Sequence, residues 1–108
     1  MEVSPEELHE LLQRPGPRGF RLIDVREEEE FLICKLDWAE LMPLSTLPEE
    51  APKRLVDQDK PIVVYCHHGV RSQHAATWLR EAGYQHVFNL TGGIDAWSDR
   101  VDPAMPRY

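Results

Sequence analysis

The chain has few cysteines, no long apolar segment and fewer basic than acidic residues. Its two cysteines, Cys34 and Cys66, are too few for the disulfide scaffold of many small secreted domains. No apolar run approaches the roughly 20 residues that span a bilayer. Acidic residues within positions 1–8 are also unlike the basic start of a signal peptide. We therefore expect a cytoplasmic protein with no membrane partner.

The charge balance argues against a nucleic acid partner. Lys and Arg number 12 against 19 Asp and Glu, which gives a net charge of −7 and a pI of about 5.1. That is the wrong sign for binding a phosphate backbone. Apolar residues make up 42% and charged residues 29% of the 108 residues, an ordinary globular composition. We expect a single domain over residues 1–108, with residues 98–108 as a C-terminal tail.

Strand and helix patterns alternate along the chain, which favours an α/β fold with a mainly parallel sheet. The first helix is expected to begin at Ser4, with Pro5 in its first turn and Glu7 closing a capping box. Acidic residues 27–30 are interpreted as the solvated start of the second helix. Helices are expected before the stop signal Pro15-Gly16-Pro17, from residues 27–30 onward, around 48–56 with Thr46 as cap, and over 72–82 with Gly83 as stop. A last short helix carries Ile94 and Trp97. Strands are expected over 20–25, at 41–44 as an edge strand, over 61–65 as a buried strand, and over 86–90.

Cys66 is the candidate nucleophile because of its position. It directly follows the expected buried strand, and the next helix begins five or six residues later. Ligands of parallel sheets bind at the carboxyl ends of strands, and a loop entering a helix aims N–H groups and the helix dipole at one point. Such a setting stabilises a thiolate. Gly69 is expected to take a positive φ, and Arg71 supplies a cation suited to an oxyanion.

The loop therefore predicts a cysteine that attacks an anionic substrate. The candidate substrate-binding residues are His67, His68, Gly69, Val70, Arg71 and Ser72. The alternative is that Cys66 packs as a small apolar residue, as many free cysteines do. The combination of strand end, spacing, glycine, arginine and helix start favours catalysis.

Three stretches resemble the rhodanese domain, the sulfurtransferase family. They are residues 22–27 (LIDVRE) with Phe31 soon after, residues 66–72 (CHHGVRS) and residues 90–97 (LTGGIDAW). The resemblance extends from Ser4 to about Trp97. It implies an α/β fold whose parallel five-stranded sheet is flanked by helices on both faces.

The resemblance also implies a reaction. Cys66 would carry a persulfide, formed with sulfane sulfur from a donor such as thiosulfate and passed to a thiophilic acceptor such as cyanide, with no cofactor. The backbone from His67 to Ser72 would cradle the sulfur, and Arg71 would bind the donor anion. One stretch departs from the family: residues 34–39 read CKLDWA where the family usually has GHIPGA. We expect this stretch on the rim of the site.

Three other functions compete with this prediction. A cysteine phosphatase needs Arg six positions after its cysteine and commonly His before it, whereas Arg71 is five positions after Cys66 and Tyr65 precedes it. A non-catalytic binding module is disfavoured because Cys66 is retained. A sulfur relay stays open, because residues 101–108 resemble the ending of rhodanese domains attached to enzymes that adenylate sulfur-carrier proteins. Such a relay would deliver sulfur to a partner protein for cofactor or tRNA thiolation.

The remaining polar and thiol residues receive supporting or structural roles. Cys66, His67, His68 and His74 are not expected to bind a metal ion, because adjacent residues do not easily share one and no paired Cys-x-x-Cys exists. The two loop histidines are expected to point outward. Asp24 and Arg26 can support the loop by hydrogen bonds, although an ion pair with a neighbouring Glu is an equal alternative. Cys34 is expected to be a weak nucleophile outside the reaction.

Overall fold

The centre of the structure is a parallel sheet of five strands. The computed structural model describes residues 1–16 and 19–108. The strands lie in the order β1-β5-β4-β2-β3, and each neighbouring pair is parallel. They are β1 (Glu2–Val3), β2 (Arg21–Asp24), β3 (Glu40–Leu41), β4 (Ile62–Tyr65) and β5 (Val87–Leu90). The predicted α/β class with a parallel sheet is confirmed.

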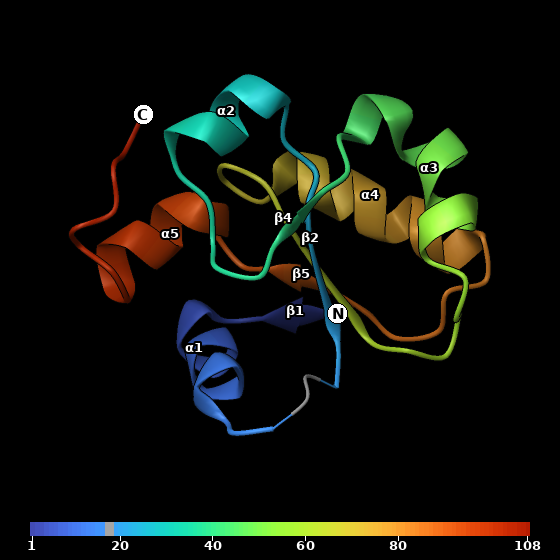
Figure 1. Cartoon of the computed structure of the whole chain (residues 1–108), viewed down its shortest axis with the longest axis horizontal. Coiled ribbons are helices and arrows are strands. Elements are labelled where there is room, and N and C mark those ends of the chain that lie inside the picture. Colours follow the sequence, from blue (N-terminus) through green and yellow to red (C-terminus); the bar gives the residue numbers. More distant parts are fainter. Residues whose placement is uncertain (17–18) are drawn as a thin grey trace.

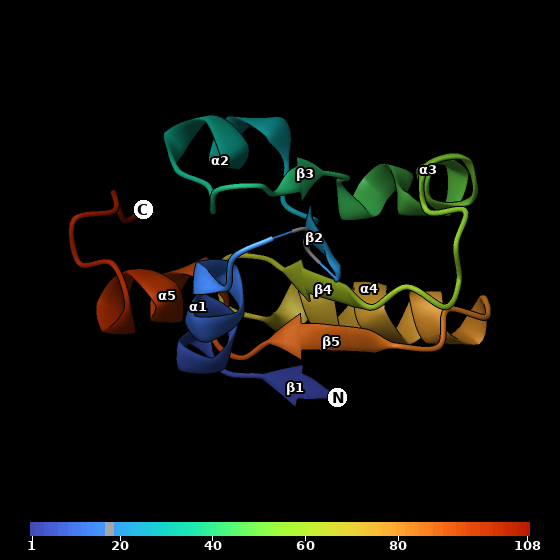
Figure 2. The same ribbon diagram turned by 60° about the horizontal axis from the view of Figure 1, so that its bottom comes forward.

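Helices cover both faces of this sheet, as predicted (Figures 1 and 2). Helices α1 (Pro5–Gln13) and α5 (Gly93–Arg100) pack on one face. Helices α3 (Leu47–Arg54) and α4 (Val70–Glu81) pack on the other, and α2 (Glu28–Ile33) lies near the end of β2. Within the two described ranges, no helix has the length and apolar character that crossing a lipid bilayer requires.

The alternation of side chains along β4 divides the core into two clusters. Ile62, Val64 and Cys66 face the cluster beneath α3 and α4. Val63 and Tyr65 face the cluster beneath α1 and α5. Both faces are buried, which explains the nearly continuous apolar run of this strand.

Local signals at helix ends are confirmed in the structure. The Ser4 hydroxyl accepts from the Glu7 N–H at 3.1 Å, and the Glu7 carboxylate accepts from the Ser4 N–H at 2.8 Å. Helix α4 ends just before Gly83, whose φ is +107°. Helix α1 ends at Gln13, so the predicted stop signal follows it, although its Pro17 lies outside the described residues.

Other boundaries differ from the predictions. The pattern missed β1, a two-residue strand that pairs with β5. Thr46 stands at the start of α3, but its hydroxyl donates to the Pro43 carbonyl at 3.3 Å because a short 3-10 turn (Leu44–Thr46) leads directly into the helix. Residues 98–100 belong to α5, so the predicted tail begins too early.

Candidate active site

The sulfur of Cys66 lies in a cradle of hydrogen-bond donors at the carboxyl end of β4. It accepts from the Gly69 N–H at 3.1 Å and from the Ser72 N–H at 3.4 Å, and the Ser72 hydroxyl lies 3.4 Å away. Gly69 has φ +105°, as the sequence predicts, which turns its N–H back toward the sulfur. Both amides belong to the start of α4, whose dipole favours negative charge at this point. The arrangement stabilises an anionic sulfur.

Asn89 of β5 holds this cradle in place. Its Nδ2 donates to the Gly69 carbonyl at 3.2 Å and to the Glu2 carboxylate at 3.4 Å, and its Oδ1 accepts a hydrogen bond from the Ser72 hydroxyl. Because that hydroxyl has one proton, a protonated Cys66 thiol can donate to the Ser72 oxygen in turn. Asn89 is not among the site residues predicted from the sequence. Its signal was a polar residue inside an otherwise apolar strand, VFNL.

The loop is also fixed from the side of α5. The Ile94 N–H donates to the Cys66 carbonyl at 2.9 Å, and the Asp95 N–H donates to the His67 carbonyl at 3.0 Å. A Cβ at Gly93 would overlap both carbonyl oxygens. The second glycine of the LTGGIDAW stretch is therefore required by the close approach of the loop backbone.

Arg71 binds the carboxylate of Glu30 rather than standing free. Its two terminal nitrogens donate to the two carboxylate oxygens at 2.6 and 2.8 Å. This contact raises the pKa of Arg71 and holds the pKa of Glu30 at about 2. The interpretation of residues 27–30 as a solvated helix start is correct for the three exposed members but wrong for Glu30, because a long-range ion pair holds it.

Asp24 and Arg26 form a fully buried ion pair beside the site. Arg26 donates to both Asp24 oxygens, with a shortest distance of 2.6 Å. Burial opposes the charge, but the hydrogen bonds outweigh it and the pKa of Arg26 is raised. Arg26 also donates to the Cys34 carbonyl at 2.6 Å and to the Tyr108 hydroxyl at 2.8 Å. The pair therefore reaches the loop through Tyr108, and the alternative of a pair with a neighbouring Glu is wrong.

The loop side chains are placed differently from one another. The His68 side chain is 65% exposed, as expected, but His67 is partly buried and stacks between His68 and Tyr108, with ring centroids 4.0 and 3.9 Å away. Burial lowers the pKa of His67. The Val70 side chain is exposed, so its contribution to substrate binding would come from its backbone.

The side chains that could bind a metal ion differ from the set considered in the sequence analysis, which was Cys66, His67, His68 and His74. Ligand atoms of His67, His68 and Asp95 lie within 4.8 Å of one another. Arg107 already binds the Asp95 carboxylate at 2.8 Å and holds the pKa of Asp95 below its usual value. The second Asp95 oxygen lies 3.8 Å from the His68 ring, so this carboxylate is already shared between two cationic or potentially cationic side chains.

Cys34 lies on the opposite face of the sheet from Cys66. It follows α2 and packs in the cluster beneath α1 and α5, whereas Cys66 belongs to the cluster beneath α3 and α4. Residues 34–39 are anchored by the buried Leu36, whose N–H donates to the Tyr65 hydroxyl at 3.2 Å. The sheet therefore separates the sulfurs of Cys34 and Cys66.

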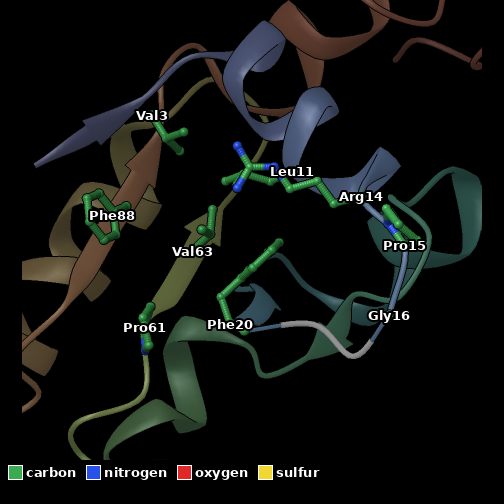
Figure 3. Close-up of a pocket in the computed structure, with 10 residues that line it drawn as sticks. Val3, Leu11, Arg14, Pro15, Gly16, Phe20, Pro61, Val63 and Phe88 are labelled. Carbon is green, nitrogen blue, oxygen red and sulfur yellow. The ribbon is translucent and has the colours of Figure 1, made fainter.

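A separate hollow of about 430 Å³ lies away from the sulfur (Figure 3). Val3, Leu11, Val63 and Phe88 line it, with the Arg14 side chain extending across it. Phe20 and Pro61, which directly precede β2 and β4, also line it, so it lies toward the amino ends of these strands. Its lining includes none of the candidate site residues.

The comparisons define the class to which this fold and loop belong. The family model described as "Rhodanese-like domain" matches residues 4–100. A rhodanese-like domain protein from Staphylococcus aureus has a similar structure, with a TM-score of 0.81 and 26% identity over 100% of this chain and 99% of that one. A rhodanese-like domain from Anabaena has a TM-score of 0.83 and 25% identity over 99% and 84% of the two chains. The chain belongs to the rhodanese-like domain family.

Curated relatives differ in how much of their length this chain covers. The thiosulfate sulfurtransferase GlpE of Haemophilus influenzae is 38% identical over 99% of this chain and 96% of its own length. The rhodanese-like/PpiC domain-containing protein 12 of Arabidopsis thaliana is also 38% identical, but this chain spans only 37% of it. The probable adenylyltransferase/sulfurtransferase MoeZ of Mycobacterium tuberculosis is 36% identical, and this chain spans 26% of it. The chain thus corresponds to nearly the full length of GlpE and to 37% and 26% of the other two relatives.

Proposed function

We propose that this protein is a sulfurtransferase that carries sulfane sulfur on Cys66 as a persulfide. The observation that supports it most directly is the Cys66 sulfur at a strand end, with the N–H groups of Gly69 and Ser72 directed at it. A persulfide anion needs such donors on its inner sulfur and an open direction for its outer sulfur. The relative GlpE, similar over nearly its whole length, is named a thiosulfate sulfurtransferase.

The reaction consists of two displacements at sulfur. In the first, the Cys66 thiolate attacks the outer sulfur of a donor such as thiosulfate, the S–S bond of the donor breaks, and sulfite leaves with the electron pair. In the second, a thiophilic acceptor such as cyanide attacks the outer persulfide sulfur, and the Cys66 thiolate leaves. Thiocyanate is released, and the Cys66 thiolate is regenerated, so the enzyme is neither oxidised nor reduced over one cycle.

Arg71 is proposed to bind the donor anion. Its guanidinium lies close enough to Cys66 for the charge on the sulfur to raise the pKa of Arg71, after the larger effect of Glu30. Planar guanidinium donors match the oxygens of a sulfonate-like group. The donor would have to share the arginine with Glu30.

The decisive experiment is mass spectrometry of the protein after treatment with thiosulfate. We expect one added sulfur atom on the peptide that contains Cys66, in the wild type and in Cys34→Ser, and none in Cys66→Ala. Cys66→Ala should lose thiosulfate:cyanide transfer while keeping its fold by circular dichroism, because the thiolate is the sulfur acceptor. Retention of most of the activity in Cys66→Ala would refute the proposal.

A parallel assay with an aryl phosphate tests the phosphatase alternative. Sulfur transfer should far exceed hydrolysis, because Arg71 stands one position too near Cys66 for the phosphatase arrangement. Faster cleavage of the phosphate ester would contradict the assignment.

A second candidate is a relay that passes the persulfide sulfur to a partner protein. The names of two relatives favour it, since MoeZ and the Drosophila sechellia protein MOCS3 are each named as adenylyltransferase and sulfurtransferase. In single turnover, the outer sulfur of the Cys66 persulfide should attack the acyl adenylate of a sulfur-carrier protein, expel AMP and form an acyl disulfide with Cys66. This step should be faster than the release of thiocyanate with cyanide at the same concentration. Transfer to cyanide alone would favour the small-molecule role.

A further inference from the structure

The segment that follows α5 turns back over the candidate active site. Figures 1 and 2 place the end of the chain beside α2 and above α5. The Met105 N–H donates to the Asp102 carbonyl at 3.1 Å, and Met105 packs against the core beneath α1 and α5. Arg107 binds Asp95 at 2.8 Å. These contacts direct the next residue, Tyr108, toward the loop that carries Cys66.

Tyr108 connects that loop to α2. Its ring stacks on His67, the residue after the nucleophile, with centroids 3.9 Å apart and an angle of 11° between the ring planes. Its hydroxyl donates to the Glu30 carboxylate at 2.8 Å and accepts from Arg26 at 2.8 Å. Burial raises the pKa of Tyr108 to about 12, so the hydroxyl keeps the proton that it donates to Glu30 at neutral pH.

A second connection runs parallel to the first. Arg71, at the start of α4, binds the same Glu30 carboxylate, and one of its oxygens accepts from both Arg71 and Tyr108. The loop side of the site and α2 are thus tied twice through Glu30. Cys66 is only 1% exposed in this arrangement. A donor or an acceptor can therefore reach its sulfur only if part of the surrounding structure moves.

Tyr108 is the tie better suited to opening. Tyr108 is a neutral group, held by hydrogen bonds from its hydroxyl to Glu30 and Arg26 and by ring contacts with His67 and Arg26. Arg71 and Glu30 carry opposite charges and are joined by two short charged hydrogen bonds, which are harder to break. We infer that residues 102–108 form a strap whose Tyr108 closes one side of the Cys66 site and limits the size of the reagents and sulfur acceptors that reach the sulfur. Its effect on acceptors rests on the proposed sulfur transfer, but its effect on access to Cys66 does not.

The strap implies an equilibrium between closed and open positions. Loss of a hydrogen bond to a charged group changes such an equilibrium by about tenfold or more. Tyr108→Phe removes the hydroxyl contacts and keeps the stacked ring, whereas Tyr108→Ala removes both. The two variants should therefore open the site in graded steps.

The test of access compares alkylation of Cys66 by a small and a large thiol reagent, iodoacetamide and fluorescein maleimide. Peptide mass spectrometry counts only the label on Cys66, so that any change at Cys34 does not enter. The ratio of the large-reagent rate to the small-reagent rate should rise about tenfold in Tyr108→Phe and further in Tyr108→Ala. Tyr84→Phe is the control, because it removes a tyrosine hydroxyl that binds the Ala51 and Leu55 carbonyls and belongs to a residue that follows α4, whereas the loop precedes this helix.

The result that overturns the strap is an equal ratio in the wild type and both Tyr108 variants, or the same rise in Tyr84→Phe. The companion measurement is persulfide transfer to glutathione relative to cyanide, which should rise in the same order among the variants. Failure to form any Cys66 persulfide in the wild type would refute the proposed function. A normal persulfide with an unchanged glutathione to cyanide ratio would refute the strap alone.

Discussion

Glu30→Gln tests two effects of the ion pair between Glu30 and Arg71: its contribution to stability and its competition with the donor anion for Arg71. The substitution keeps the size of the side chain and one carbonyl acceptor, but it removes the negative charge that receives both Arg71 donors. It also weakens the acceptor for the Tyr108 hydroxyl. We expect the protein to become less stable and the donor anion to bind more tightly, two effects of opposite direction from one change.

The expected loss of stability follows from the charge on Glu30. Its contacts with Arg71, and next with Tyr108, hold its pKa at about 2. The side chain is 19% exposed, so solvent screens part of this interaction. We expect a decrease of about 1 to 2 kcal/mol in the free energy of unfolding at pH 7.

The difference in unfolding free energy between the wild type and Glu30→Gln should decrease as the pH falls. Because the folded-state pKa lies below the unfolded one, the Glu30 contribution is complete above about pH 5 and is lost as the pH falls toward 2. The difference between the wild type and Glu30→Gln should therefore shrink by about half between pH 7 and pH 3 in urea titrations. A constant difference would show that the charge is not its source.

The kinetic expectation concerns the KM for thiosulfate. A negative charge about 4 Å from an anion costs about 1 kcal/mol even in water, so its removal should lower KM about fivefold. Glu28→Gln is the control, since it removes the same charge from the same helix turn at an exposed position. Arg71→Ala should raise KM instead. If Glu30→Gln also raised KM, Glu30 would orient Arg71 for the donor rather than compete with it.

Two other substitutions test the cradle and the second thiol. Asn89→Leu removes the donor to the Gly69 carbonyl and the acceptor of the Ser72 hydroxyl, so we expect a loss of about 1 to 3 kcal/mol in urea unfolding and slower persulfide formation in single turnover with thiosulfate. Wild-type persulfide kinetics in that variant would show that Asn89 is only structural. Cys34→Ser should leave transfer to cyanide nearly unchanged, because the two sulfurs belong to clusters on opposite faces of the sheet. Loss of turnover in steady-state assays, with Cys66 persulfide still formed, would instead make Cys34 a relay.

The sequence predicts the framework of the site because local chemistry determines it. Ser4 and Glu7 form a capping box through contacts within four residues, so the start of this helix can be recognised locally. The β-branched run before Cys66 is typical of a strand buried on both faces. A short loop between that strand and the next helix has few possible paths. The positive φ of Gly69 and the amides directed at the sulfur follow from it.

The sequence does not predict which distant charges and amides meet at the loop. Glu30 lies 41 positions from Arg71 and 78 from Tyr108, and Asn89 lies 17 from Ser72. An acidic residue in a first helical turn is explained locally by the helix dipole, so nothing in the pattern distinguishes Glu30 from its exposed neighbours. The distinction arises only when the sheet order brings β2 and β4 side by side.

Residues 34–39, which depart from the family's usual sequence, include a glycine-like backbone conformation without the glycine. Trp38 occupies the second glycine position of the family's GHIPGA stretch, and its φ is +73°, in the left-handed region that glycine favours. A non-glycine residue there costs about 1 to 2 kcal/mol. Two anchors hold the path nonetheless: the buried Leu36 beneath Tyr65, and the Cys34 carbonyl bound to Arg26. Packing at these anchors therefore determines the turn, and the residue at its tip adapts.

Arg26 anchors more than this stretch. A buried ion pair contributes little net stability, but loss of one partner leaves an unpaired charge that costs about 3 to 5 kcal/mol. Arg26 joins the end of β2, the end of α2 and Tyr108, so a substitution there would disturb the fold and the strap together. Tyr108, which is exposed, contacts this buried pair through Arg26 alone. Variants of Tyr108 can therefore alter access to Cys66 while Asp24 and Arg26 keep their bond, which makes the strap testable apart from the fold that supports it.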